Sequence, residues 1–553
     1  MRLPKIKYAS GIAKPKQTVF GGLNHSTGAG DGELWDMRNL TSDHYPVMAT
    51  RAPRMKYRSL AAPGGLFSWD ELCWVDGTDF YFAGEVKGQV SEGEKVFASM
   101  GAYIVIFPDK CCYNTETGEF RSMESRWTGT VRFHSGTYAG VEAYANTLSA
   151  EGVNWADYFS VGDAVEIDQE ESTFEGPPFP IGPLVIREIE YDSDTEEGSL
   201  RFYENSFTSL VQKQGEFEIG TQLNGVTVKR TVPDLKFLCE NENRLWGCTE
   251  NTIYASKLGD IFNWNVYDGL ETDAYAVDTG SAGAFTGCIS YQGYPTFFKE
   301  DHIYKVYGSV PSNFEVMGGA TLGLAEGSSR SLAVAGEVLF YLNRSGVMAY
   351  TGGIPQPMGA AFGTNRFRNA VGGSDGLKYY ASMQDEGGAW GLYVYDTQRG
   401  LWHKEDETHV IHFARWAGNL YFLNEQGELW ITGNVQDPPA DVTEETDVEW
   451  MAEFADFTAD EPNKKGISKI QIRLELEQGA KAQAWLMCDS DGVWLPVGDA
   501  LGEDVKRSYY LPIIPRRADH YRLKITGTGG CRIHSVAREH YTGSALRSTT
   551  GRN

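Results

Sequence analysis

Short apolar stretches recur along this chain, each followed by a polar turn and a second apolar stretch. Residues 243–264 show the unit as NRLWGCTENTIYASKLGDIFNW, where the polar TEN separates RLWGC from TIYAS and Trp264 ends the segment. Such stretches are too short for helices and are typical of β-strands. The segment is therefore predicted to be a β-hairpin whose tail ends in a tryptophan.

The hairpin pattern repeats along the chain. Similar hairpins are predicted to begin near residues 71, 102, 243, 292, 336, 377 and 418, and the last three steps are 44, 41 and 41 residues. A period of about 40–45 residues with about four short strands indicates a β-propeller, whose blades bury their faces against one another. The sequence predicts an all-β fold with a six- or seven-bladed β-propeller. A pair of β-sandwiches is the alternative, although the regular step is harder to explain that way.

One long segment interrupts the repeats. The hairpins near 102 and 243 lie 141 residues apart, so residues 127–232 are expected to be an inserted domain between propeller segments 61–126 and 233–435. The stretch GVEAYANTLSAEGVNWADYF in it is predicted to be a helix, and alternating stretches follow. The insert is therefore expected to be a small β-barrel or sandwich with one helix.

The two ends of the chain lack the repeat. After residue 435, ISKIQIRLELE alternates strictly between apolar and polar positions, which predicts a C-terminal β-sandwich over residues 436–540. Residues 1–60 are expected to be an extended arm, and residues 541–553 a polar tail.

Charge and cysteine content narrow the classes of function. The net charge is −26, and no basic cluster is visible of the kind that grips phosphates, so sequence-specific nucleic-acid binding is not expected. The acidity either keeps the protein soluble or gives a surface that does not hold passing DNA. Eight scattered cysteines without a C-x-x-C pair predict reduced thiols rather than a zinc site. Neither a secretory signal nor an apolar run of membrane-spanning length is seen, so no membrane partner is expected.

Two acidic segments resemble known sequence motifs without matching them, so no catalytic, cofactor-binding or metal-binding residue is predicted. In DSDGVW (489–494) the Gly and Trp are too close for a sialidase-type Asp box, so a hairpin turn is expected. Asp192, Asp194 and Glu196 alternate as in a calcium loop, but Tyr203 occupies the position of its closing glutamate. An acidic hairpin tip is therefore expected. A glycosidase with paired carboxylates stays open, because their separation depends on the tertiary structure.

The histidines also give little support for a metal site or a catalytic site. His409 and His412 in HVIHFARW would point to opposite faces of a strand, which disfavours a metal site. His520, His534 and His540 lie in the predicted sandwich without a paired carboxylate at helical spacing. The protein is thus predicted not to be an enzyme.

Three stretches resemble one known family. They are GGLNHSTGAGDGELWDMRNLTSDHYPVMATRAPR, RLWGCTENTIYASKLGDIFNW and LPIIPRRADHYRLKITGTGGCRIHSVAREHYTGS. They resemble phage stabilisation proteins of phages and prophages from Gram-positive gut bacteria. These are similar to the tail accessory factor of short-tailed phages, which closes the tail channel after genome packaging. The inserted domain need not exist in those proteins, and no active-site residue carries over.

The resemblance implies a non-enzymatic structural protein of the virion, assembled in the host cytoplasm and placed in the neck or tail. It implies a homo-oligomeric ring of about six copies with other neck and tail proteins as partners. Such a ring could line a DNA channel. No cofactor is implied.

The residues themselves suggest one interface and one alternative function. Arg516 and Arg517 lie on a predicted loop of an otherwise acidic chain, where they could pair with carboxylates of a neighbouring subunit; a solvated or intradomain pair is the alternative. The alternative function is a carbohydrate-binding or glycan-cleaving propeller at the tail tip. Trp402 or Trp416 would then line a sugar groove, unless both belong to the blade cores.

Overall fold

The folded chain consists almost entirely of β-strands. The computed structural model describes residues 12–169, 179–214, 217–435, 437–458, 464–513 and 517–542. Apart from four short 3-10 turns, all elements in these ranges are strands, which confirms the all-β prediction. The chain divides into two compact units, Ala62–Gly323 and the combination of Met1–Ala61 with Leu324–Asn553.

Four antiparallel sheets of the propeller-blade type follow one another in the unit Ala62–Gly323. In each, four successive strands pair in chain order. The first two sheets contain β7 (Pro63–Trp69), β8 (Glu71–Asp76), β9 (Asp79–Phe82) and β10 (Glu85–Gln89), then β11 (Val96–Met100), β12 (Tyr103–Phe107), β13 (Cys111–Asn114) and β14 (Phe120–Ser122). The other two contain β23 (Phe237–Asn241), β24 (Arg244–Cys248), β25 (Thr252–Ala255) and β26 (Tyr275–Asp278), then β27 (Gly287–Tyr291), β28 (Tyr294–Phe298), β29 (His302–Tyr307) and β30 (Glu315–Ala320).

Each of these sheets shares an apolar core with the next. Val75 and Phe80 of the first sheet pack with Ile104 of the second. Val105 of the second packs with Leu245 of the third, and Trp264 closes the same core. The indole nitrogen of Trp264 donates a hydrogen bond to the Ile261 carbonyl at 2.9 Å. A thin sheet cannot cover both of its own faces, so face-to-face stacking of successive sheets removes these apolar side chains from water.

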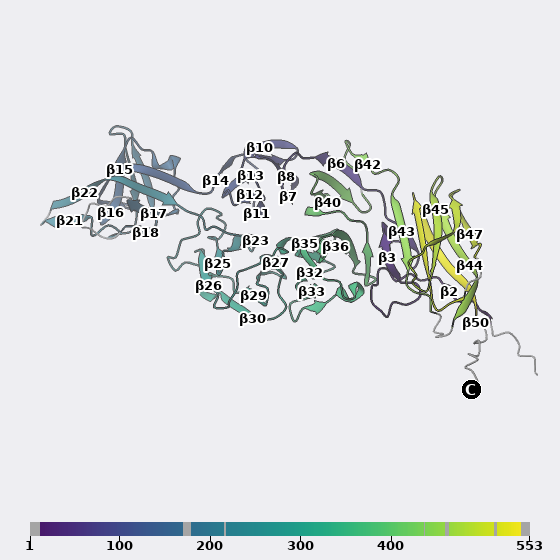
Figure 1. Ribbon diagram of the computed structural model, residues 1–553. Helices are drawn as coiled ribbons and strands as arrows, with labels where there is room; N and C mark the ends of the chain where they lie inside the picture. The colour runs from purple at the N-terminus through teal and green to yellow at the C-terminus, as the bar shows by residue number, and fades with distance from the viewer. Residues whose placement is uncertain are drawn as a thin grey trace, which may run out of the picture. The chain divides into compact units, whose positions relative to one another are not determined.

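The segment between the second and third sheets forms a larger sheet of its own, seen in Figure 1 as the strands β15 to β22. The order is β18-β17-β22-β15-β16-β20-β19, with β21 also pairing with β22. Trp155, Phe133 and Phe207 lie in its buried core. The strands are β15 (Ser125–Tyr138), β16 (Val141–Glu151), β17 (Ala164–Gln169), β18 (Ile181–Val185), β19 (Glu188–Asp192), β20 (Glu197–Arg201), β21 (Val211–Gln214) and β22 (Phe217–Arg230).

The helix expected over residues 140–159 is wrong. This stretch forms β16 and the 3-10 turn η1 (Trp155–Asp157). β16 pairs with β15 on one side and with β20 on the other. Local helix formers such as alanine and leucine are overridden because the stretch is a central strand with partners on both sides. Gly152, at a φ of 72°, ends the strand by turning the chain.

Three further blade sheets lie in the other unit. The first contains β31 (Ala333–Ala335), β32 (Val338–Asn343), β33 (Gly346–Tyr350) and β34 (Gln356–Pro357); the second contains β35 (Phe367–Ser374), β36 (Lys378–Asp385), β37 (Trp390–Asp396) and β38 (Leu401–Lys404). The third contains β39 (Val410–Trp416), β40 (Asn419–Asn424), β41 (Glu428–Thr432), β6 (Met55–Ser59) and β42 (Thr443–Glu444). The 3-10 turns η2 (Pro311–Asn313), η3 (Ser329–Ser331) and η4 (Gly359–Phe362) lie in the connections between strands.

All seven predicted hairpins are confirmed as pairs of neighbouring strands inside these sheets, for example β24 with β25 and β40 with β41. The propeller class is thereby established. The described residues contain seven sheets of blade type, and the number of blades in a closed ring stays a prediction. The division between the two compact units falls at residues 323 and 324, inside the predicted propeller.

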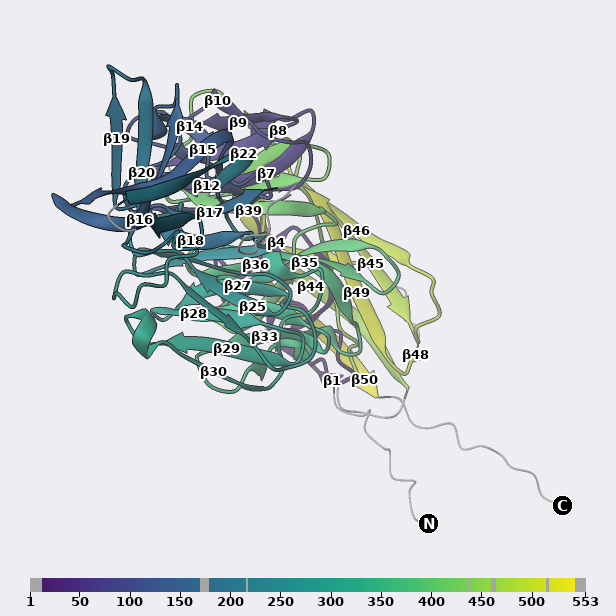
Figure 2. The same cartoon turned by 90° about the vertical axis from the view of Figure 1, so that its left-hand side faces the viewer.

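Two sheets face each other across one core to form the C-terminal β-sandwich (Figures 1 and 2). The larger follows the order β4-β5-β50-β44-β47, with β1 and β2 also on β50 and β48 on β44. The smaller follows the order β3-β43-β49-β45-β46. The C-terminal strands are β43 (Glu449–Phe454), β44 (Lys465–Leu476), β45 (Lys481–Cys488), β46 (Leu495–Leu501), β47 (Val505–Leu511), β48 (Arg517–Ala518), β49 (Tyr521–Thr528) and β50 (Cys531–Thr542).

The segment expected to be an extended arm contributes strands to three sheets. β1 (Ile12–Ala13), β2 (Lys16–Gln17), β4 (Leu40–Thr41) and β5 (Met48–Thr50) join the larger sandwich sheet, β3 (Leu34–Arg38) joins the smaller one, and β6 joins the last blade. Figure 2 shows β1 beside β50. The arm is thus part of the folded unit in the described residues, because the sandwich uses it to complete both sheets.

The chain leaves the blades at the start of the inserted sheet and returns to them at an adjacent point. Ser125, at the start of β15, pairs with Arg230, at the end of β22. Such strand neighbours lie about 5 Å apart. We therefore expect replacement of residues 127–228 by a short Gly-Ser bridge to leave the remaining chain folded, with a strand-type circular dichroism spectrum and a cooperative thermal transition.

The midpoint of that transition should fall moderately. The insert contacts its blades through Ala164, Val185 and Val266, and the amide of Asn263 donates to Asp163 at 2.9 Å. Aggregation of the deletion variant, or loss of the cooperative transition, would contradict an independent insert.

Candidate interaction site

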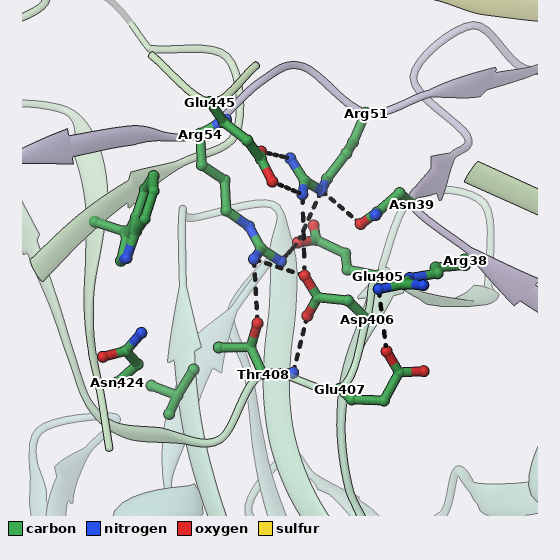
Figure 3. Close-up of polar contacts among 12 residues, drawn as sticks. Arg38, Asn39, Arg51, Arg54, Glu405, Asp406, Glu407, Thr408, Asn424 and Glu445 are labelled. Carbon is green, nitrogen blue, oxygen red and sulfur yellow. Dashed lines mark hydrogen bonds and ion pairs between the residues drawn. The ribbon is translucent and has the colours of Figure 1, made fainter. Parts of the chain in front are cut away.

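Two buried arginines connect β5 and β6 to distant parts of the chain. Arg54 is 5% exposed, and its Nη2 donates to Glu405 Oε2 at 2.7 Å. Its Nη1 lies 2.7 Å from Asp406 Oδ2 and donates to Thr408 Oγ1 at 3.2 Å. Figure 3 shows that Glu405, Asp406 and Thr408 all face this guanidinium from the connection between β38 and β39.

Arg51, the second arginine, binds a carboxylate from a third segment. Its Nη1 and Nη2 donate to the two oxygens of Glu445 at 2.7 and 3.0 Å, and its Nε donates to Asn39 Oδ1 at 2.8 Å. Glu445 also accepts a hydrogen bond from the backbone nitrogen of Arg54 at 3.1 Å. We call Arg51, Arg54, Glu405, Asp406 and Glu445 the arginine cluster.

Mutual attraction outweighs the effect of burial on the pKa of Arg54, Asp406 and Glu445. Burial alone would raise the pKa of Asp406, but the Arg54 charge and the hydrogen bonds from Thr408 hold it at about 2. Burial would likewise lower the pKa of Arg54, but Asp406 and Glu405 raise it above its usual value. The pKa of Glu445 is lowered because the effects of Arg51 and Arg54 outweigh that of burial. The cluster therefore binds β6 and the segment that leads into the sandwich to the last two blades.

A groove lies beside the arginine cluster, with a volume of about 970 Å³. Its floor belongs to the smaller sandwich sheet, and Lys404 and Glu407 from the β38–β39 region form one wall. Arg38 contacts Glu407 and Glu449, each at 3.6 Å, and Lys404 donates to Glu407 at 3.1 Å. The arginine cluster thus fixes the connection that carries this wall.

Five large apolar side chains are exposed on or next to the strands that end the two sandwich sheets. β46 is the last strand of the smaller sheet and β47 the last strand of the larger one. The exposed residues on or next to these strands are Val493 (54%), Leu495 (45%), Leu501 (60%), Val505 (50%) and Tyr510 (58%). Unpaired edge strands with apolar side chains are surfaces on which another chain can add. We call this surface the sandwich edge.

One of the two predicted interface arginines, Arg517, lies near one end of the larger sheet. Arg517 is exposed in β48, where Gly466 of β44 is its strand partner. Arg516 falls outside the described residues. The role of both residues in an interface stays a prediction.

Other residues singled out from the sequence serve local structure. Trp402 is 3% exposed in the core, and its indole nitrogen donates to the Met358 carbonyl at 2.9 Å. Trp416 is half-buried and lies 5.8 Å from the Tyr421 ring centroid. Asp192 accepts a backbone hydrogen bond from Asp194 at 2.9 Å in the turn between β19 and β20. The expectations of a core tryptophan at 402 and an acidic hairpin tip are confirmed.

The histidines are dispersed. His409 stacks on Trp390 at 3.6 Å, whereas His412 is buried, and burial lowers its pKa well below the usual value. His520 contacts Ser490, and His534 contacts Glu475. His540 is buried in β50. Among the described residues, no group of three or more His, Cys, Asp or Glu is arranged to hold a metal ion.

The cysteine side chains are mostly buried. None of the eight cysteines, all within the described residues, forms a disulfide, and seven are buried. Burial raises the pKa of Cys112 to about 11, so this thiol stays protonated at neutral pH. Within the described part of the chain, no helix has the length and apolar character needed to cross a membrane.

Sequence reasoning missed both the arginine cluster and the groove. The segment RAPR holds Arg51 and Arg54, and EDE holds Glu405 and Asp406, but about 350 residues separate them. Nothing local pairs the two segments. The one sequence feature that pointed to the arginine cluster was the closely spaced pair Arg51 and Arg54 in a strongly acidic chain.

Comparisons with known proteins give no family. No family model and no curated protein matches the chain. An exo-β-1,3-galactanase from Phanerochaete chrysosporium shares 8% identity at a TM-score of 0.21, covering 54% of this chain and 94% of that one. The computationally designed Ika8 protein shares 9% at 0.32, covering 69% and 100%. PorZ of Porphyromonas gingivalis, a bacterial surface component of the type-IX secretion system, shares 10% at 0.26, covering 87% and 77%. The site is therefore interpreted from its own geometry.

The arginine cluster predicts a pH-dependent stability. The pKa of Asp406 lies below its unfolded value of 3.8, at about 2, so its ionic contribution is complete above pH 3.8 and is lost as the pH falls through 2. That shift corresponds to roughly 2 kcal/mol. We expect Asp406→Asn to lower the free energy of unfolding at pH 7 by about 2–4 kcal/mol, because Arg54 loses a buried partner.

The difference in free energy of unfolding between the unmodified protein and Asp406→Asn should shrink as the pH falls from 4 toward 2. Urea unfolding at each pH measures this difference. Asp441→Asn is the matched control, because Asp441 is exposed. A deficit that stays constant down to pH 2 would show that Asp406 does not stabilise the fold through its charge.

Proposed function

We propose that this protein is a non-enzymatic structural component of a bacteriophage virion, assembled as a ring in the neck or tail that stabilises or closes the tail channel after DNA packaging. The sequence resemblance to phage stabilisation proteins suggests this role. The structural observation that carries the proposal is the sandwich edge, where apolar side chains are exposed and β46 and β47 are each paired on one side only among the described residues of this acidic protein.

The sandwich edge suits contact between subunits. Val505 and Tyr510 are 50% and 58% exposed on β47, and Lys506 and Arg507 between them are also exposed. Apolar and aromatic side chains supply most of the energy at interface centres, and an edge strand adds main-chain hydrogen bonds. The neighbouring lysine and arginine can pair with carboxylates, which are abundant on a chain of net charge −26.

The net charge fits a place along a DNA channel. Seventy-five acidic residues against 49 basic ones give a surface that repels phosphates, so a genome could pass without being held. This agrees with the expectation that the protein does not read DNA sequence. The partners would then be further copies of this chain and other neck or tail proteins.

We expect the full chain to form assemblies larger than a monomer as its concentration rises, detected by mass photometry and by light scattering after size exclusion. Val505→Lys combined with Tyr510→Lys should shift that transition to at least tenfold higher concentration, because two charges would then be buried in the contact.

Ile354→Lys is the matched control, since Ile354 is 78% exposed on a blade away from the sandwich edge. All variants should keep the same thermal midpoint. Assembly of the double variant at unchanged concentration would remove the sandwich edge from the contact.

The place in the particle needs a separate measurement. Cryo-electron microscopy of the parent particle should show the chain as a ring in the neck or tail, and Arg517→Glu should reduce its incorporation as counted by mass spectrometry of purified particles. Absence of the chain from purified particles would overturn the proposed function, and normal incorporation of Arg517→Glu would overturn the interface role of Arg517 alone.

A further inference from the structure

The floor of the groove is a regular array of side chains on neighbouring strands. Leu501, Lys481, Thr528 and Glu449 are cross-strand partners in one row. Asp499, Gln483, Thr526 and Met451 form the next row. Adjacent strands lie about 4.8 Å apart, so polar groups repeat at that spacing along each row.

Three polar side chains of this floor have no partner among the described residues. Among the described residues, no side chain or backbone atom forms a hydrogen bond or ion pair with the side chains of Lys481, Gln483 and Asp499. Lys481 offers donors, Asp499 offers acceptors, and the Gln483 amide offers both. The half-buried Met451 and the 60% exposed Leu501 add apolar contact surface at opposite ends.

The wall, in contrast, is already neutralised. Arg38 contacts Glu407 and Glu449, and Lys404 contacts Glu407, so these charges are paired within the protein. The complete lining carries Arg38, Lys404 and Lys481 against Asp36, Glu407, Glu449 and Asp499. A ligand in this groove would therefore meet little net charge and a rigid, ion-paired wall.

These features exclude the common macromolecular occupants. A nucleic acid needs excess positive charge, which this lining lacks. A polypeptide strand adds at a sheet edge, whereas β43, β49 and β45 have both edges paired inside the sheet. Protein interfaces are also depleted of charged residues at their centre, whereas this floor carries Lys481 between Leu501 and Thr528.

We propose that the groove is a binding site for a neutral oligosaccharide. Sugar hydroxyls both donate and accept hydrogen bonds, so they match the unpartnered groups of Lys481, Gln483 and Asp499, while the C–H faces of the rings lie against Met451 and Leu501. A volume of about 970 Å³ is at the upper end of the usual range for ligand sites, about 300–1,000 Å³, and leaves room for several sugar rings. The inference does not rest on the virion role, and it places sugar binding on the sandwich rather than at Trp402 of the propeller.

The test uses the full chain on an array of neutral oligosaccharides (glucans, galactans and N-acetylglucosamine oligomers) together with anionic ones. We expect selective binding to neutral oligosaccharides. In titration calorimetry with the strongest of these, Gln483→Ala combined with Asp499→Ala should weaken binding at least tenfold.

Gln356→Ala is the matched control, because Gln356 is an exposed glutamine in the short blade strand β34, outside the groove. It should bind as the unmodified chain does, and all variants should share one thermal midpoint. Three results would overturn the proposal: no selective binding on the array, selective binding of anionic oligosaccharides alone, or undiminished binding by the double variant. The outcome is independent of the assembly measurements, which probe Val505 and Tyr510.

Discussion

A four-stranded sheet has two faces and cannot bury both by itself, and the blades of this protein depend on that constraint. The hydrophobic stretches that form β8, β12 and β24 bury nearly every side chain, so each sheet needs a neighbour on both sides. Stacking successive sheets satisfies the need, as Val75 and Ile104 show in one shared core. Long connections are then free to carry other structure, including the inserted sheet between Ser125 and Arg230.

In the other unit, the arginine cluster lies where the chain crosses between the sandwich and the last blade. The chain contributes β1 to β5 to the sandwich, crosses to the last blade through β6, and returns to the sandwich after β42. Arg51 and Arg54 lie at the first crossing, and Glu445 lies at the second. Buried ion pairs add little net stability, but they penalise wrong arrangements, because each unpaired charge would cost several kcal/mol. The cluster is suited to fixing how this sandwich meets its blades, and with it the wall of the groove.

The sandwich presents two surfaces with different chemistry. The sandwich edge is apolar, with Val505 and Tyr510 exposed, and suits another protein chain. The groove floor is polar, with Gln483 and Asp499 unpartnered among the described residues, and suits hydroxyl groups. The sandwich edge lies at the ends of the two sheets and the groove lies on a sheet face, and Leu501 belongs to both surfaces. The proposed virion assembly and the proposed glycan binding would then use neighbouring surfaces of the sandwich.

The sequence by itself determined the all-β class, the seven hairpins, the acidic hairpin tip after Asp192 and the core position of Trp402, because alternation and turn residues act over a few positions. It failed at residues 140–159, where pairing with β15 and β20 overrides local helix preference. It also left open where residues 12–59 belong, since their strands pair with partners hundreds of positions away, as Ile12 does with Tyr541. Only the tertiary structure decided the arginine cluster and the groove, because each brings together side chains that no local sequence pattern relates. Arg54 donates a hydrogen bond to Glu405, and Lys404 lines the same groove as Gln483.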